Sequence, residues 1–312
     1  MTAAGASRPN PALGRSKAGR IRFADRAATV ALWAVAIVVI TTLLAIIAHF
    51  VIASIGVISI SFLTSAPSDT DLGGIGPLIW NSLYILVLTL IFTVPFGILG
   101  GIYMAEYARE GRVTEAIRFC QELTSAVPSI VVGLFGLAFF VGVTGWGFSA
   151  LAGALALTVF NLPLLSRLTE QAIRAVPPDE RAASLAIGAS KWQTIRHVVM
   201  PLALPGIVTG LILTSGRIFG EAAALIFTAG LSTPTAYDFS NFSLTDPSSP
   251  WSPLRPATTL SVYIWKLNSE GLSPFVREIA DGSATVLVFM VLIFNVAARF
   301  VSRALQRRMA GS

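Results

Sequence analysis

The chain has 312 residues, of which 54% are hydrophobic and 12% are charged, and its formal net charge is +6. A soluble domain carries about 25% charged residues, so this composition excludes a globular protein that covers its surface with charge. The lone cysteine, Cys120, excludes an internal disulfide, and together with His49 and His197 it provides no metal site.

The first 25 residues are rich in Ala, Gly, Ser, Pro and Arg and lack an apolar pattern that could bury a core. This composition predicts a disordered, basic tail over residues 1–25. The membrane domain is then expected to occupy residues 26–312.

Six long apolar runs follow the tail. They cover residues 28–50, 78–105, 126–143, 148–165, 202–229 and 282–298. A helix needs about 20 such residues to span a bilayer. The third and fourth runs are short and closely spaced, which predicts a hairpin. The sequence therefore predicts an all-α integral membrane protein with six transmembrane helices.

Lys and Arg residues gather on one side of these predicted spans. They lie in the tail, in the second-to-third and fourth-to-fifth loops, and at the C-terminal end. Apart from Arg217, only Arg255, Lys266 and Arg277 lie elsewhere. Because cytoplasmic loops of membrane proteins are enriched in Lys and Arg, both termini are expected in the cytoplasm. The same bias explains the basic composition, so a nucleic-acid partner is not expected.

Arg167 and Glu170 close the fourth predicted span on its cytoplasmic side. One interpretation is an interfacial pair whose stems lie on apolar surface while the charged heads reach water. The other is that both side chains line a path for a substrate.

Residues 174–201 form a cytoplasmic loop that reads as an amphipathic helix after two prolines. Its apolar residues recur every three or four positions, at Leu185, Ala189, Trp192, Ile195 and Val199. Asp179 is placed to cap the helix, and Gly188 permits a bend. Such a helix either lies on the membrane surface or presents its polar side, with Arg181, Ser184 and Lys191, to a cytoplasmic partner.

The stretch SGRIFGEAAALIF, residues 215–227, places two charges inside the fifth predicted span. Each charge at the centre of a span costs about 2.5–3.5 kcal/mol on insertion scales. On a continuous helix Arg217 and Glu221 form an i, i+4 pair, in the less favourable order. Either they neutralise each other, or they face a wet path in which the guanidinium of Arg217 meets an anion such as phosphate. In the second case Glu221 weakens the hold enough for release.

The predicted outer loop over residues 230–281 is about 50 residues long, and loops of that length usually have a function of their own, such as docking or gating. The alternative is a solvated connector.

Residues 174–201 resemble the EAA loop of ABC importer permeases. Gly188 and Pro201 are thirteen positions apart, as that pattern requires, and Ala182 stands where the family has its glutamate. The resemblance implies a type I ABC importer permease fold and a short coupling helix that sits in a groove of an ATPase subunit. The implied coupling residues are Glu180, Ala182, Ala183, Gly188, Lys191, Trp192 and Pro201.

Other segments resemble the PstA-type phosphate permeases of this family. They are SFLTSAP (61–67), GGIGP (73–77), NSLY (81–84), AVPSIVVGLFGL (126–137), RLTEQAIRAVP (167–177) and GRIFGEAA (216–223). This resemblance implies that Arg167 lies on the translocation path. It also implies a second permease in a heterodimer, a dimer of nucleotide-binding ATPase subunits, and a periplasmic or lipid-anchored phosphate-binding protein.

The sequence contains no Gly-Lys dipeptide and therefore no P-loop, so the chain cannot hydrolyse ATP by that mechanism. ATP and magnesium are expected on the partner ATPase, and no cofactor is expected in this chain. The leading hypothesis is a permease subunit of an ATP-driven phosphate importer in the bacterial inner membrane, and not an enzyme in its own right. The alternatives are a permease for another oxyanion or small solute, or a secondary transporter that needs no ATPase.

Overall fold

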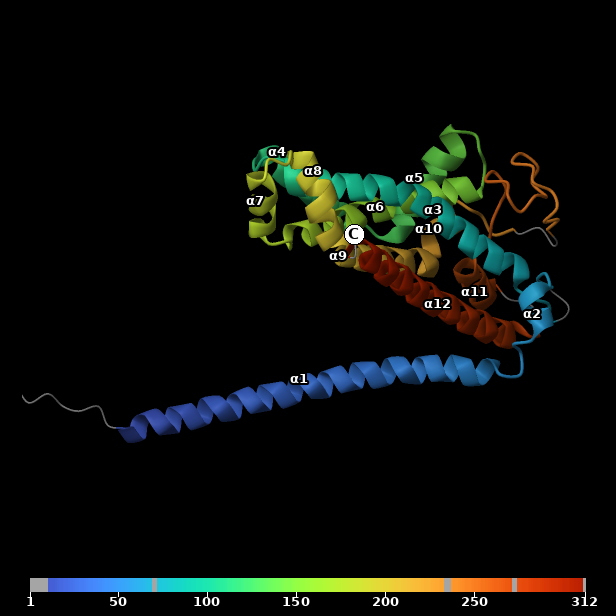
Figure 1. The fold of residues 1–312 in the computed structure, drawn as a ribbon. Coiled ribbons are helices and arrows are strands. Elements are labelled where there is room, and N and C mark those ends of the chain that lie inside the picture. The colour runs from blue at the N-terminus through green and yellow to red at the C-terminus, as the bar shows by residue number, and fades with distance from the viewer. Residues whose placement is uncertain (1–10, 69–71, 233–236, 271–273, 311–312) are drawn as a thin grey trace, which may run out of the picture. The chain divides into compact units, whose positions relative to one another are not determined.

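The computed structural model describes residues 11–68, 72–232, 237–270 and 274–310, with side chains described from residue 25 to residue 304. The described chain is helical throughout apart from its loops (Figure 1). It divides into two compact units, residues 1–52 and residues 53–312, and each is described by itself.

The first unit consists of the helix α1, Pro11–Ser54, up to the unit boundary. Its part from Asp25 to Ser54 is long and apolar enough to cross a membrane. Residues 11–25 are helical here, although the sequence predicts a disordered tail, and residues 1–10 lie outside the described residues. Extending an existing helix costs far less than nucleating one, and Ala, Arg and Lys in this segment are good helix formers.

The second unit contains the other helices. They are α2 (Ile60–Thr64), α3 (Gly76–Ile102), α4 (Arg112–Ala126), α5 (Ser129–Gly136), α6 (Ala150–Arg174), α7 (Pro178–Ala186), α8 (Lys191–Thr194), α9 (Met200–Gly220), α10 (Ala223–Ile226), α11 (Leu260–Glu270) and α12 (Val276–Ala310). Three π-helical segments continue α3, α5 and α8: η1 (Tyr103–Tyr107), η2 (Leu137–Val143) and η3 (Ile195–Val199).

Five helices of the described chain are long and apolar enough to span a membrane, and a sixth candidate is a bent pair. The pair joins α4 to α5 and η2 with a bend of 98°. Pro128 explains the bend, because the residue before a proline is pushed out of the helical region, and Val127 is extended with ψ 132°. The predicted all-α membrane fold is confirmed, with the third predicted span forming half of this bent pair.

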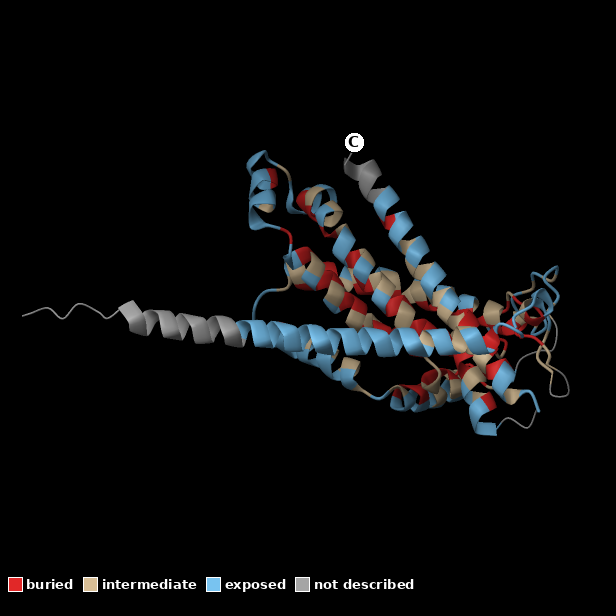
Figure 2. Ribbon diagram, turned by 90° about the horizontal axis from the view of Figure 1, so that it is seen from below, coloured by how far each residue is buried: buried red, intermediate tan, exposed pale blue. Residues whose placement is uncertain are grey.

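The helix α6 is the centre of the second unit and packs against α3, α9, α4 and α5. Close approach of α3 and α6 depends on glycine, since a Cβ on Gly101 would lie 2.5 Å from the Cβ of Thr169. Figure 2 shows the buried residues of this unit on the inward faces of its helices.

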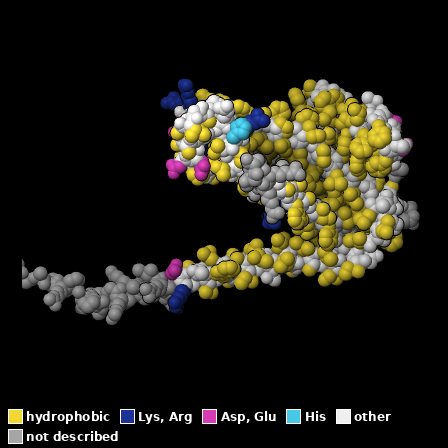
Figure 3. All heavy atoms as spheres, in the orientation of Figure 1, with side chains coloured by type: hydrophobic (Ala, Val, Ile, Leu, Met, Phe, Trp, Pro, Cys, Tyr) yellow, Lys and Arg dark blue, Asp and Glu magenta, His cyan; other side chains and the backbone are white. Residues whose placement is uncertain are grey.

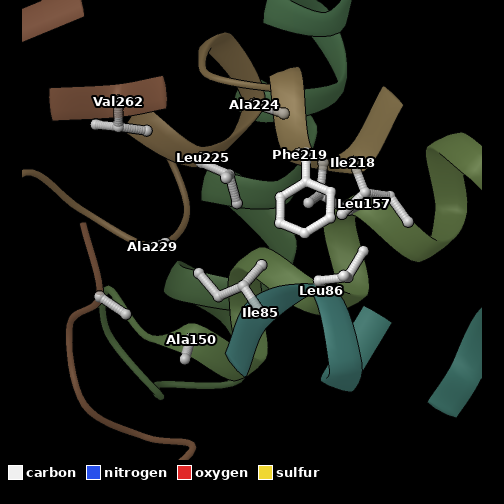
Figure 4. Packing of buried hydrophobic residues seen from close by; sticks show 11 residues of the cluster. Ile85, Leu86, Ala150, Leu157, Ile218, Phe219, Ala224, Leu225, Ala229 and Val262 are labelled. Carbon is white, nitrogen blue, oxygen red and sulfur yellow. The ribbon is translucent and has the colours of Figure 1, made fainter. Parts of the chain in front are cut away.

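One hydrophobic cluster joins α3, α6, α9, α10 and α11 (Figure 4). It contains Leu86 of α3, Leu157 of α6, Phe219 of α9, Leu225 of α10 and Val262 of α11. Burial of such side chains stabilises a packed core by about 1.5–3 kcal/mol each in water, and dispersion contacts serve the same purpose in lipid. The cluster fixes the position of the break between α9 and α10.

Large hydrophobic side chains also cover the outside of the spans, among them Val87 and Ile91 on α3, Leu213 on α9, and Leu292 and Ile293 on α12. The space-filling view shows this apolar surface, with most of the visible charge at the end that holds α7 and α8 (Figure 3). An apolar exterior between charged ends is the surface that a bilayer requires.

Candidate functional site

The fifth predicted span is broken at Glu221. The helix α9 ends at Gly220, Glu221 is extended (φ −74°, ψ 123°), and α10 begins two residues later. The Glu221 side chain accepts a hydrogen bond from the backbone N–H of Ala224 (3.2 Å), and its carbonyl accepts one from the hydroxyl of Ser261 (2.7 Å). Arg217 and Glu221 therefore do not form an i, i+4 pair on a continuous helix, which was one of the two interpretations, because the helix ends before Glu221.

Arg217 lies in the last turn of α9, where the helix dipole favours a cation. Its guanidinium carbon stacks 3.8 Å from the centre of the Phe160 ring, a cation–π contact with the middle of α6. In the described part of the chain no carboxylate lies within ion-pair distance of Arg217. The charge is held by an aromatic face and a helix end, and it remains available to an anion.

Glu170 binds two arginines other than the one predicted beside it. Its Oε1 accepts hydrogen bonds from Nη2 (2.8 Å) and Nε (3.2 Å) of Arg118 on α4, and lies 3.0 Å from Nε of Arg174. The Glu170 side chain is only 7% exposed. Arg167 is exposed, one turn earlier on the same helix. The i, i+4 spacing from Glu170 to Arg174 could have predicted their ion pair from the sequence. Arg118 is 52 residues from Glu170, and no sequence pattern predicts that contact.

These side chains surround a cavity of about 320 Å³ between α4 and α6. Its lining consists of Arg118, Gln121, Glu122, Arg167, Glu170, Gln171 and Arg174. Phe160 and Glu170 are ten residues apart on α6, which corresponds to about 15 Å along a helix. The predicted path residues thus form two separate charged sites along α6. One is Arg217 of α9, which stacks on Phe160, and the other is this cavity.

The predicted loop helix over residues 174–201 is two helices with a turn between them. Gly188 has φ +89°, a left-handed conformation that favours glycine, and Ser190 starts α8 with a capping box completed by Gln193. At the start of α7 the cap residue is Pro177, and Asp179 lies inside the first turn, so the predicted Asp179 cap is wrong.

Two basic residues of this loop bond to neighbouring elements of the unit. Arg181 donates to the carbonyls of Val176 (2.6 Å) and Ile173 (2.7 Å) and pairs with Glu106 of η1 (3.1 Å). Lys191 donates to the carbonyl of Glu106 and lies over the Tyr107 ring. These contacts attach α7 and α8 to the ends of α6 and η1.

The apolar side chains of the same loop point outward, which reverses part of the predicted amphipathic pattern. Leu185, Trp192 and Ile187 are 50%, 53% and 86% exposed. Ser184 is buried by a 2.9 Å hydrogen bond to Thr194. Ile195 and Val199 are buried, as the pattern predicts. Of the coupling residues implied by the resemblance, all except the half-buried Pro201 are exposed.

The burial of an arginine at the opposite end of the second unit was not predicted from the sequence. Arg255 is 0% exposed. Its guanidinium donates to the carbonyls of Pro250 (3.0 Å) and Pro256 (3.3 Å) and to the hydroxyl of Tyr237 (2.6 Å). Burial lowers the pKa of Arg255 and raises the pKa of Tyr237. Three side chains of α3 bond to the same segment: Trp80, Tyr84 and Asn81 donate to the carbonyls of Pro250, Trp251 and Thr258. The segment from Tyr237 to Thr258 is therefore packed onto α3 and is not a solvated connector.

Residues 97–311 match the family described as binding-protein-dependent transport system inner membrane component. The chain is 46% identical over 295 residues to the "Probable ABC transporter permease protein YqgI" of Bacillus subtilis (strain 168), covering 93% of this chain and 99% of that protein. It is 34% identical over 245 residues to the phosphate transport system permease protein PstA of Pasteurella multocida (strain Pm70), covering 76% and 79%.

Two solved structures share the fold. A chain of a bacterial alginate ABC transporter, in complex with an alginate-bound periplasmic protein, superposes with a TM-score of 0.60 at 18% identity, covering 88% of this chain and 95% of that one. A chain of the methionine ABC transporter MetNI in an inward-facing conformation superposes with a TM-score of 0.53 at 19% identity, covering 74% and 94%.

Proposed function

Because the chain belongs to the family of binding-protein-dependent transport system inner membrane components, and is a multi-pass permease subunit of an ABC importer in the bacterial inner membrane, we propose that its cargo is inorganic phosphate. The PstA relatives are phosphate permeases by name, at 31–37% identity. The protein is expected to form part of the translocation path and to transmit work from a separate ATPase.

The observation that carries this proposal is Arg217 beside a broken helix. Non-helical backbone at membrane depth is tolerated only where it is buried in protein or lines a wet cavity. Arg217 lies one turn before such a break, and Phe160 orients its guanidinium without neutralising it. A guanidinium fork matches the oxygens of a tetrahedral oxyanion, which a lysine cannot do in the same bidentate way.

Glu221 has a double role in this proposal. Its side chain accepts a hydrogen bond from the Ala224 N–H in the first turn of α10 and would help to maintain the break that leaves Arg217 at the path. Its negative charge also weakens the attraction of Arg217 for the anion, and a conducting site must bind weakly enough to release.

The exposed apolar side chains of Leu185, Ile187 and Trp192 supply the proposed docking surface for the ATPase dimer. Force applied there passes through Arg181 directly to the carbonyls at the end of α6, the helix that carries Phe160 and Glu170. ATP and magnesium would be bound by that partner. A second permease subunit would complete the path as a heterodimer, and a phosphate-binding protein would dock on the segment around Arg255, at the other end.

The decisive experiment is uptake of radiolabelled phosphate by cells that lack this gene, complemented with wild type, Arg217→Gln or Arg109→Gln at equal membrane levels. Arg109 is an exposed arginine that lies neither beside Arg217 nor in the lining of the cavity, and it serves as the matched control. We expect wild type and Arg109→Gln to restore uptake, and Arg217→Gln to reduce it at least about tenfold through loss of a charge-assisted contact.

Uptake restored by all three proteins would refute the role of Arg217 and leave the cargo assignment intact. No uptake with well-expressed wild type would overturn phosphate as the cargo, and the same cells would then be tested with other oxyanions.

A further inference from the structure

The cavity between α4 and α6 is rich in hydrogen-bond donors. Three guanidinium groups and two carboxamides line about 320 Å³, against two carboxylates, so the cavity carries one net positive charge when empty. Arginine and carboxamide N–H groups are the donors that recognise phosphate oxygens. The chemistry of the lining therefore suits a dianion better than a cation or an apolar group.

Helical spacing brings these donors to one place. Arg167, Glu170 and Arg174 follow one another at intervals of three and four residues and share one face of α6. Arg118 and Gln121 are three residues apart on α4, where Arg118 binds Glu170 and Gln121 donates to Ser166 (3.2 Å). Both helices thus turn their donors toward the same space and are held at a fixed separation by these bonds.

Glu170 occupies the position that an anion would take. Its Oε1 alone receives the hydrogen bonds of Arg118 and the ion pair with Arg174. The carboxylate is nearly buried, whereas the arginine side chains are 39% and 45% exposed and can turn toward a ligand in the cavity. A carboxylate and a phosphate compete for the same guanidinium geometry.

We propose that this cavity is a binding site for a phosphate group, formed by Arg118, Arg167 and Arg174, and that Glu170 is the internal competitor that returns to the arginines when the site empties. The inference rests on the proposed function for its role, because it adds a second station about 15 Å along α6 from Arg217. Competition by Glu170 keeps the site weak, and weak sites in series allow an anion to leave.

A phosphate group could reach this cavity from two sources. Inorganic phosphate would reach the cavity from the path, and the headgroup of an anionic phospholipid would reach it from the neighbouring membrane surface. The experiment therefore uses both, on the complete nucleotide-free transporter in nanodiscs. All variants also carry Arg217→Gln, which removes phosphate binding at Arg217 from the measurement.

Binding of radiolabelled inorganic phosphate is measured first, in nanodiscs of phosphatidylcholine. We expect Arg118→Gln to weaken binding about tenfold through loss of charge-assisted hydrogen bonds, Glu170→Gln to strengthen it, and Arg109→Gln to leave it unchanged. The opposite signs matter, because a purely structural ion-pair network would be weakened by both of the first two variants. If Arg118→Gln does not assemble, Arg118→Lys and Arg174→Gln serve in its place.

The second arm uses nanodiscs that contain phosphatidylglycerol, with the retained lipid counted by native mass spectrometry. Retention that falls in Arg118→Gln and rises in Glu170→Gln supports the site with a lipid headgroup as its occupant. The proposal is overturned if neither probe responds to these variants, or if Glu170→Gln weakens binding as Arg118→Gln does. If wild type does not restore phosphate uptake, phosphate is refuted as the cargo, and the binding measurements remain valid. If uptake is normal and neither binding experiment responds to the variants, only the proposed phosphate site in the cavity is refuted.

Discussion

Arg255 is fully buried and Arg217 is half-buried, and the chain stabilises the two charges in different ways. Arg255 is surrounded by carbonyl and hydroxyl oxygens that take up its donors, so it is a structural group. Arg217 has an aromatic face and a helix end instead, and in the described part of the chain no carboxylate lies within ion-pair distance of it. Whether an arginine is fully paired within the protein is visible only from its partners in the fold.

Replacing Arg255 by Met is expected to destabilise the segment from Tyr237 to Thr258. The change removes the donors to two carbonyls and a hydroxyl in a buried place, and each lost hydrogen bond of this kind costs about 1–3 kcal/mol. We expect the thermal unfolding midpoint of the purified protein to fall by about 5 °C or more. The midpoint is measured by the fluorescence of the nearby Trp80 and Trp251. Arg277→Met, at an exposed position of α12, is the control. Equal midpoints for the two variants would contradict the structural role of Arg255.

Replacing Glu221 by Gln separates the two roles proposed for this residue. Glutamine retains an oxygen that can accept from the Ala224 N–H, so the start of α10 is preserved, while the negative charge near Arg217 is lost. We expect phosphate to be held more tightly, with both the Km and the maximal rate of uptake falling, the rate by about tenfold. Glu278→Gln on the exposed start of α12 is the control. A maximal rate equal to that of wild type would exclude a charge effect of Glu221.

At the scale of elements, three breaks between helices shape the regions around the proposed sites. α4 and α5 are separated at Pro128, α7 and α8 at Gly188, and α9 and α10 at Glu221. Proline and glycine signal the first two breaks in the sequence. The third falls directly after Gly220, but a single glycine inside a long apolar run is a weak signal, and the run therefore predicts one continuous helix.

Gly188→Ala is expected to impair assembly with the ATPase. Nothing lies within 4 Å of a Cβ at this position, so the cost of about 1–2 kcal/mol comes only from the left-handed backbone at φ +89°. We expect less ATPase to co-purify with Gly188→Ala, and a smaller loss with Gly188→Asn, because asparagine tolerates this conformation better. Gly111→Ala is the matched control, since Gly111 is open to solvent and extended. Equal recovery with all three variants would show that the turn does not govern docking.

At the scale of the whole molecule, the distribution of Lys and Arg predicts the orientation in the membrane, and the single cysteine offers a test of that prediction. Cys120 is exposed on α4, at the end of the second unit that holds α7 and α8. If both termini and this end are cytoplasmic, a membrane-impermeant maleimide will label Cys120 in inside-out vesicles and not in intact cells. The Cys120→Ser, Ser248→Cys variant moves the thiol to an exposed position at the opposite end and should show the reverse pattern. Labelling of wild type in intact cells would reverse the proposed topology.

The sequence by itself determined the class of the protein, the positions of most of its candidate membrane spans, and the family resemblance of the loop over residues 174–201. These features depend on local composition: apolar runs of spanning length, a one-sided distribution of Lys and Arg, and the spacing from Gly188 to Pro201. It also predicted Arg217, Glu221, Arg167 and Glu170 as charges that need an explanation, because a charge near a span is costly wherever it points.

The tertiary structure alone decided which partners these charges have. The pairing of Arg118 with Glu170, the stacking of Arg217 on Phe160, and the contact of Arg255 with the Tyr84 ring all join residues on different segments. The outward face of Leu185 and Trp192 was likewise set by the inward bonds of Arg181 to α6. A periodic pattern states that a helix has two faces, but which face is buried depends on what packs against it.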